Sequence, residues 1–246
     1  MDRALYVGMT GAIATLQAQT ANSHNLANAA TVGFRAELAA AQSVNVDGAG
    51  FQTRVNSQLT DNGWDSSQGS IMQTGESLDI AMKGNNWLAV QTPDGSEAYT
   101  RAGDLRLDPN GQLRTANGLA VLGDGGPISL PISTSVSIGN DGTITAVPQG
   151  QSAAAQVVVG RLKVVSGAQD QLQRGADGLM RAKTGVTLNP AASDVLASGA
   201  LESSNVNLAT SMVNMINLAR QFELQSKVMK ATEDNAQAAT SLVSLN

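Results

Sequence analysis

The chain of 246 residues contains no cysteine, which excludes disulfide bonds, thiolate metal sites and a cysteine nucleophile. Only 3% of its residues are aromatic, too few for a core of large rings or for platforms that stack nucleic-acid bases. Its 15 basic residues against 20 acidic ones argue against duplex DNA or RNA as a partner. No apolar run reaches the ~18 residues of a transmembrane helix, and residues 1–20 lack the pattern of a secretory signal peptide.

The common motifs of catalysis and of metal binding are also missing. There is no G-x-S-x-G and no H-E-x-x-H, and the single histidine, His24, has no candidate nucleophile beside it in the sequence. The Gly-rich stretch 123–126 lacks the pattern of a phosphate-binding loop, so it is interpreted as a turn. The stretches 108–111 and 140–142 lack the ligand spacing of calcium loops and are interpreted as hairpin turns. We therefore expect no enzymatic activity, no cofactor and no bound metal.

The stretch 205–246 predicts one long helix, because no Gly or Pro interrupts it after Ser211 and its apolar residues keep a helical spacing. These apolar residues fall into two stripes. The first comprises Leu208, Met212, Met215, Ala219, Phe222, Met229, Ala236 and Val243. The second comprises Ile216, Leu224, Val228, Ala231, Ala238, Leu242 and Leu245. Two stripes on one helix predict more than one helical neighbour, supplied by the rest of the chain or by other copies of it.

Residues 5–30 predict a second amphipathic helix, with the same spacing through Leu5, Met9, Ala12, Leu16 and Leu26. A helix of this composition is marginal in water by itself, so it needs a partner. The simplest arrangement is an antiparallel pair formed by the two ends of the chain.

The middle of the chain predicts β structure. Turn signals recur about every ten residues over 78–183, which is typical of an antiparallel β domain. Residues 36–77 are interpreted as an extended connector with strand-like pieces at 52–59 and 70–74, and 184–204 as a second connector. The predicted fold is α+β: residues 1–35 and 205–246 supply the long helices of a coiled-coil-like domain, and the central domain is an antiparallel all-β domain.

Three groups of residues resemble motifs of the flagellar rod and hook family of bacteria. The N-terminal group is Asn25-Leu26-Ala27-Asn28 followed by Thr31 and Gly33-Phe34, which fits the L-A-N and T-x-G-F patterns of that family. The C-terminal group begins with Glu202-Ser203-Ser204-Asn205-Val206-Asn207 and continues through Met215, Arg220, Phe222 and Glu223. The central group runs from Asp94-Gly95-Ser96 to Asn110-Gly111-Gln112-Leu113. The resemblance covers almost the whole chain, in the family's order.

The resemblance implies a structural subunit of the proximal rod, which polymerises through its terminal helices into part of the torque-transmitting drive shaft. It implies export through the flagellar type III apparatus without a cleaved signal peptide, and a place in the rod within the periplasmic space. The implied partners are other copies of the chain, other rod proteins and the export apparatus, with no nucleic acid and no small-molecule substrate. The assembly motif comprises Asn25, Leu26, Ala27, Asn28, Thr31, Gly33, Phe34, Ser204, Asn205, Val206, Asn207, Met212, Met215, Arg220, Phe222 and Glu223.

Two alternatives remain at this stage. The first is a distal-rod subunit of the same family; the opening residues and the segment Trp87-Leu88-Ala89-Val90-Gln91 look more like those of proximal-rod members. The second, from a different class, is a ligand-binding or enzymatic β domain with helical ends that serve oligomerisation. A convergent set of polar residues in a deep pocket would favour that second alternative.

Overall fold

The structure is a computed structural model that describes residues 3–45, 55–151, 154–191 and 194–243. The chain forms two compact units. Unit 1 comprises Met1–Asn28, Glu37–Trp64 and Val206–Asn246, and unit 2 comprises Ala29–Ala36 and Asp65–Asn205. The backbone therefore passes between the units at four peptide bonds, after residues 28, 36, 64 and 205. These four crossings position the candidate site described below.

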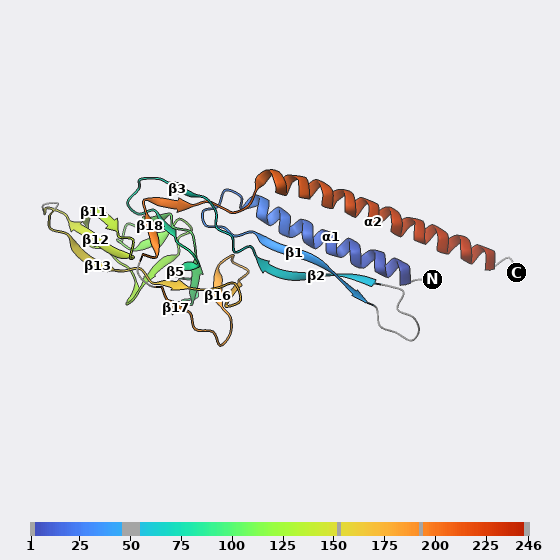
Figure 1. The fold of residues 1–246 in the computed structure, drawn as a ribbon, viewed down its shortest axis with the longest axis horizontal. Coiled ribbons are helices and arrows are strands. Elements are labelled where there is room, and N and C mark those ends of the chain that lie inside the picture. The colour runs from blue at the N-terminus through green and yellow to red at the C-terminus, as the bar shows by residue number, and fades with distance from the viewer. Residues whose placement is uncertain (1–2, 46–54, 152–153, 192–193, 244–246) are drawn as a thin grey trace. The chain divides into compact units, whose positions relative to one another are not determined.

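Unit 1 contains two helices and one hairpin, α1 (Arg3–Ala27), α2 (Leu208–Val243), β1 (Glu37–Asn45) and β2 (Val55–Trp64). Helix α1 contacts α2 and both strands, and Figure 1 shows the two helices side by side. The helices run antiparallel: Asn22 near the end of α1 donates to the carbonyl of Ser211 near the start of α2, at 2.8 Å. None of the described helices is long and apolar enough to cross a membrane.

Small residues let α1 approach α2 closely. A Cβ atom on Gly8 would lie 3.0 Å from Met229 Cγ, and one on Gly11 would lie 3.2 Å from Gln225 Nε2. The next residue along this face, Thr15, donates its hydroxyl proton to Gln225 Oε1 at 3.1 Å. The two glycines weaken α1 as an isolated helix. They also leave room for the long side chains of α2.

The residue ranges of the two helices agree with the predicted ranges to within a few residues at each end. The region 36–77 differs more, because it contains the long hairpin β1–β2 where a connector with short strand-like pieces was expected. The predicted piece 70–74 corresponds to strand β3 (Ile71–Gln73). Residues 55–59 of the other predicted piece lie in β2, as expected. Its residues 52–54, and Leu245 of the second helical stripe, lie outside the described residues. The predicted domain boundaries stay a prediction.

Unit 2 is built of short strands, and every strand pair in the described part of the chain is antiparallel. After β3 the strands are β4 (Ile80–Met82), β5 (Asn86–Gln91), β6 (Glu97–Thr100), β7 (Leu105–Leu107), β8 (Leu113–Thr115), β9 (Ala120–Gly123), β10 (Gly126–Pro127), β11 (Ser133–Ile138), β12 (Thr143–Pro148), β13 (Val157–Arg161), β14 (Val164–Ser166), β15 (Leu172–Arg174), β16 (Met180–Ala182), β17 (Asn189–Pro190), β18 (Leu196–Ser198) and β19 (Ala200–Glu202). The prediction of an α+β chain with terminal helices and a central antiparallel β region is confirmed.

The strands of unit 2 form one large sheet and several small ones. The large sheet has ten strands, with the order β15-β16-β6-β5-β9-β8-β7 along its main path. Strands β11, β12 and β13 form a separate sheet of three. The late strands β18 and β19 pair with β4 and β3, so residues from the predicted connector 184–204 close the fold of unit 2.

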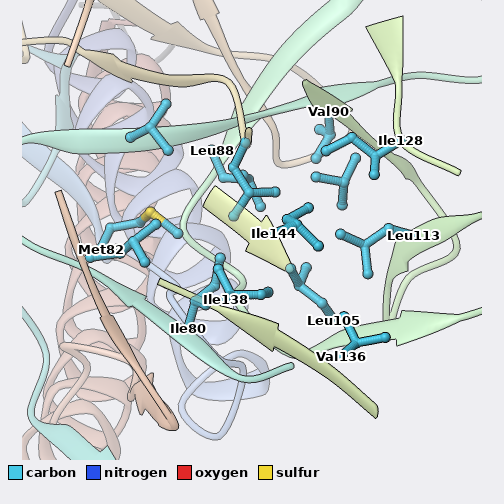
Figure 2. Packing of buried hydrophobic residues seen from close by; sticks show 14 of the residues in the cluster. Ile80, Met82, Leu88, Val90, Leu105, Leu113, Ile128, Val136, Ile138 and Ile144 are labelled. Atoms are coloured by element: carbon cyan, nitrogen blue, oxygen red, sulfur yellow. The ribbon is translucent and has the colours of Figure 1, made fainter. Parts of the chain in front are cut away.

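The core of unit 2 is made of aliphatic side chains from both sheets. Leu88 and Val90 of the large sheet and Ile144 of the three-stranded sheet are fully buried. They belong to one cluster with Ile80 and Leu113, which Figure 2 shows from close by. Aliphatic packing takes the place of aromatic rings, as the composition predicts.

The predicted turns of unit 2 are confirmed. Gly111 and Gly142 lie in the hairpin loops before β8 and β12 with φ values of 79° and 86°, a region that favours glycine. Aspartates brace such loops: Asp141 accepts hydrogen bonds from the backbone N–H and the hydroxyl of Thr143, at 3.0 and 2.6 Å. The stretch 123–126 is likewise the tight connection between β9 and β10. The carboxylate of Asp141 therefore stabilises its own turn by accepting hydrogen bonds from it.

The turn carboxylates predict that the protein loses stability in acid. The hydroxyl of Thr92 and the N–H and hydroxyl of Ser96 hold the pKa of Asp94 at about 2, below its usual 3.8, and Thr143 lowers the pKa of Asp141. A lowered folded-state pKa stabilises the fold above the unfolded-state value, and this stabilisation is lost as the pH falls through the folded-state value. We expect the melting temperature, followed by circular dichroism, to fall between about pH 4 and pH 2. Asp94→Asn should reduce that dependence on pH; an unchanged dependence would contradict the assignment.

Candidate functional site

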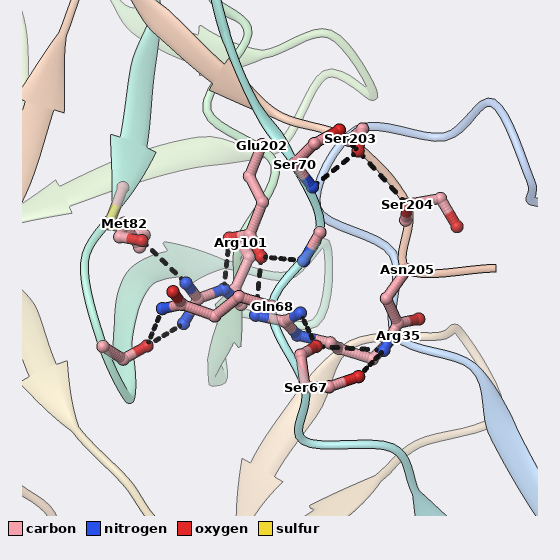
Figure 3. A network of polar contacts seen from close by, with 12 residues as sticks. Arg35, Ser67, Gln68, Ser70, Met82, Arg101, Glu202, Ser203, Ser204 and Asn205 are labelled. Carbon is pink, nitrogen blue, oxygen red and sulfur yellow. Dashed lines mark hydrogen bonds and ion pairs between the residues drawn. The ribbon is translucent and has the colours of Figure 1, made fainter. Parts of the chain in front are cut away.

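The predicted motif residues lie in two kinds of place, at the crossings between the units and on the helices of unit 1. At the crossings, the centre of the arrangement is the carboxylate of Glu202 at the end of β19. It forms an ion pair with Arg35 at 2.6 Å and another with Arg101 at 2.7 Å. All three side chains are almost fully buried, and Figure 3 shows the two guanidinium groups on either side of the carboxylate.

The charges of this cluster do not balance, since two cations share one anion. Burial first, and then the charge of Arg101, lower the pKa of Arg35 from its usual value to about 10, and burial also lowers the pKa of Arg101. Glu202 opposes both shifts through its charge and its hydrogen bonds. The burial of both arginines in the interior therefore depends on Glu202.

Arg101 joins the cluster to the large sheet. Its guanidinium donates to the carbonyls of Gly84 and Asn86 at 2.8 Å and to the carbonyl of Met82 at 2.7 Å. It also lies over the ring of Trp87, 5.5 Å from the ring centroid. Arg101 thus binds three carbonyls across the connection between β4 and β5 and is itself bound to Glu202.

Asn205 of unit 2 lies at one of the four crossings and binds residues of unit 2 at two others. Its Oδ1 accepts the N–H of Ala36 at 2.8 Å. Its Nδ2 donates to the carbonyl of Asp65 at 3.2 Å and to the carbonyl of Ser67 at 3.0 Å. Its backbone N–H donates to the carbonyl of Phe34 at 3.3 Å. An asparagine side chain suits this position because both its acceptor Oδ1 and its donor Nδ2 are used.

Asn25 has a similar role on the side of unit 1. Its Oδ1 accepts the N–H of Glu37 at 2.7 Å, and its Nδ2 donates to the carbonyl of the same residue at 2.9 Å. Glu37 also pairs with Trp64 in the hairpin, and its carboxylate contacts His24 Nδ1 at 2.9 Å. The asparagine side chain thus binds the start of β1 as a strand neighbour would. His24 thus takes part in this local structure.

The remaining N-terminal motif residues shape the chain between Asn28 and Arg35. Asn28 follows the last residue of α1, and its side chain donates to the carbonyl of His24 at 2.9 Å. Gly33 has a φ of 68°, and a Cβ there would lie 2.3 Å from the backbone of Arg101. Only glycine fits both constraints. Phe34 lies under the guanidinium of Arg174, 5.0 Å from the ring centroid, and its N–H donates to the carbonyl of Thr31 at 3.3 Å.

At the start of α2, Asn207 is the N-cap: its Oδ1 accepts the N–H of Thr210 at 3.0 Å. Ser204 accepts a hydrogen bond from the Ser203 hydroxyl at 3.2 Å, and Val206 is half-buried. The other motif residues divide by exposure. Half-buried are Leu26, Met215 and Phe222, and exposed are Ala27, Met212, Arg220 and Glu223. The structure therefore brings part of the motif to the crossings and leaves part on the surface of the helices.

Large apolar side chains remain exposed on both helices of unit 1. On α1 they are Tyr6, Met9, Ile13 and Leu16, which repeat with the three–four spacing of a helix–helix seam. On α2 they are Leu208, Met212, Val213, Ile216, Leu224 and Val228. Leu224 and Val228 are each 61% exposed. Exposure of this many large apolar side chains on neighbouring helices is unusual for a monomer. We name these two sets the exposed apolar surface of unit 1.

Sequence reasoning missed the ion cluster. Arg35 and Arg101 were not among the predicted site residues, and Glu202 was quoted only as the first letter of a motif. The available signal was that Glu202 opens the C-terminal motif and Arg101 lies in the central one. Nothing in the spacing of residues 35, 101 and 202 indicates that their side chains meet. The assembly role of the predicted motif residues stays a proposal.

Comparisons with known proteins give consistent matches. The family model described as "Flagellar basal body rod FlgEFG protein C-terminal" matches residues 197–242, and "Flagellar hook protein FlgE/F/G D1 domain" matches residues 81–146. The flagellar basal-body rod protein FlgF of Escherichia coli (strain K12) is 44% identical over 252 residues, covering 100% of both chains. FlgF of Salmonella typhimurium is 40% identical with the same coverage. FlgG of Buchnera aphidicola from Acyrthosiphon pisum is 30% identical over 98% of this chain and 100% of its own length.

The buried cluster makes a direct prediction for stability. Glu202→Gln leaves two buried guanidinium groups without their carboxylate, so we expect the free energy of unfolding in urea to fall by about 3–5 kcal/mol. The matched control is Asp177→Asn, which breaks the partly exposed pair of Asp177 and Arg181 at 2.7 Å. That change should cost less than about 1 kcal/mol. Equal losses in the two variants would show that Glu202 has no special role.

Proposed function

The chain belongs to the FlgF family of flagellar basal-body rod proteins, and from that premise we propose that it joins the proximal part of the rod through the exposed apolar surface of unit 1. It is a structural subunit of the rod of the flagellar basal body and assembles with other rod proteins. The observation that carries the proposed route of assembly is the uncovered apolar side chains on α1 and α2. Their burial against neighbouring subunits stabilises an assembly by about 25 cal/mol per Å² of apolar area, less the entropy of ordering.

We propose that α1 and α2 pack as a coiled coil and that other copies of the chain add helices to it. The described α2 residues that are half-buried follow a three–four spacing, namely Met215, Leu218, Phe222, Gln225, Met229, Thr232, Ala236 and Ala239. This spacing is typical of a coiled-coil seam. The hydrogen bond between Thr15 and Gln225 lies on the seam, where a polar pair favours one register over the others. The exposed apolar surface supplies the seams for the added helices.

We infer a proximal position in the rod from the family. FlgF relatives are 44% and 40% identical to the chain, and the FlgG relative described above is 30% identical. A distal-rod subunit is the alternative. We further propose export of the chain through the flagellar type III apparatus without a cleaved signal peptide, and a place for the rod in the periplasmic space. A chain without cysteine suits such a route, because no disulfide can form before assembly.

We infer a structural and not an enzymatic role. The polar side chains of Arg101 and Asn205, which converge in unit 2, bind backbone segments to one another. The function proposed here, a part of the torque-transmitting drive shaft, requires stiff contacts between subunits and no chemistry.

The assembly surface can be tested with two single substitutions. Leu224→Asp and Ile216→Asp place a charge on side chains that are 61% and 54% exposed, so the fold should tolerate both. Each removes a contact worth about 1.5–3 kcal/mol, and we expect incorporation into rods to fall about 10- to 100-fold. Electron microscopy of basal bodies from a strain that carries only the variant, together with its swimming, measures the effect.

The matched control for these variants is Gln221→Asp, which adds the same charge at an exposed polar position of α2. It should leave incorporation and swimming close to normal. Circular dichroism melts of the purified variants must match the original protein, so that a failure to assemble is not a failure to fold. Normal rods built from Leu224→Asp and Ile216→Asp would refute the proposed surface.

A further inference from the structure

We propose that the carboxylate of Glu202 holds together the three segments that lead from unit 2 to unit 1, so that these segments open cooperatively and share an applied force. We name this set of contacts the tie, and Glu202 its hub. The exit segments are residues 33–36, 65–70 and 202–205, which run up to the crossings after residues 36, 64 and 205. The inference rests on the proposed function, because a rod subunit bears load. It adds a mechanism inside the subunit that assembly through α1 and α2 does not require.

Backbone hydrogen bonds connect all three exit segments. The N–H of Asp65 donates to the carbonyl of Ala36 at 2.8 Å, which joins the first two segments. The N–H of Ser203 donates to the carbonyl of Ser70 at 2.9 Å, which joins the second and third. The N–H of Gly33 donates to the carbonyl of Glu202 at 2.8 Å, which joins the third and first. The segments form a closed ring of contacts within unit 2.

The carboxylate of Glu202, which belongs to the third segment, adds a charged bond to each of the other two. Its Oε1 pairs with Arg35 of the first segment and accepts the N–H of Gly69 of the second at 3.0 Å. Its Oε2 pairs with Arg101, which is bound to the connection between β4 and β5. One side chain thus links three exit segments to the large sheet.

The burial of these charges makes their bonds interdependent. If one exit segment moved away from Glu202, the carboxylate or a guanidinium would be left in the interior without its partner, which is strongly unfavourable. The remaining bonds would lose their geometry as well, since they share the same two oxygens. The exit segments should therefore open in a single step. A force that arrives along one backbone connection is then distributed over the three segments and the large sheet.

Native-state hydrogen exchange of the full chain tests this tie. The reporters are the backbone amides that bond across the segments, those of Gly33, Asp65, Gly69, Ser203 and Asn205. In the original protein we expect all five to share one opening free energy and one dependence on denaturant. Separate opening free energies for the three segments would overturn the proposal.

Two variants sharpen the test. Asn205→Ala removes bonds to Ala36, Asp65 and Ser67, yet in a cooperative tie it should speed exchange of all five reporters by one common factor, on the order of tenfold. An effect confined to Asp65 and Asn205 would contradict cooperativity. Glu202→Gln should separate the reporters into groups with different rates. If they stayed in one group, Glu202 would not be the hub.

Asp177→Asn serves as the control and should leave the five rates unchanged. Amides of the large sheet, such as that of Val90, report whether each variant remains folded, because this residue is fully buried and pairs with its neighbours on both sides. Since exchange is measured on the free subunit, the result does not depend on assembly. Failure of the Leu224→Asp test would leave the tie standing, and failure of the exchange test would leave the assembly surface standing.

Discussion

The structure of unit 2 depends on one buried carboxylate placed between two guanidinium groups. Glu202 lies at the end of the last strand, Arg35 lies before the first, and Arg101 lies between them in the chain. Neither arginine is tolerable in the interior without the glutamate. The fold of the β region is therefore complete only when both ends of its sequence are present, although its aliphatic core is formed by the strands in between.

Two asparagines of the family motifs, Asn25 and Asn205, bind the backbone in the same way. Ala36 and Glu37 are consecutive residues, and each is bound by an asparagine side chain of its own unit, Asn205 and Asn25 respectively. An amide offers one acceptor and two donors without adding a charge, so it can satisfy a backbone that leaves one unit and enters the other. These asparagines of the motifs thus hold the backbone where the chain crosses between the units.

The sequence predicted the elements that depend on local signals. The helices follow from apolar spacing, and the turns at Gly111 and Gly142 follow from Asp, Asn and Gly in series. The hairpin β1–β2 was missed because its strands lack an alternating pattern: β1 carries Ala, Gln, Ser and Asn along an exposed surface. The ion cluster was missed for a different reason. Its members are brought together by strand pairing over long distances in the chain, which no spacing rule encodes.

The proximity of Asp65 and Asn205 has a consequence for how such a chain can change. The 139 residues between them begin and end within one hydrogen bond of each other, at 3.2 Å. To the rest of the polypeptide, that whole stretch is an insertion with its two ends side by side. The loops of such a segment can be lengthened or shortened while its two ends stay together, provided that Glu202 remains to pair with Arg35 and Arg101. The β region can therefore vary in its outer loops while its connection to the helices is preserved.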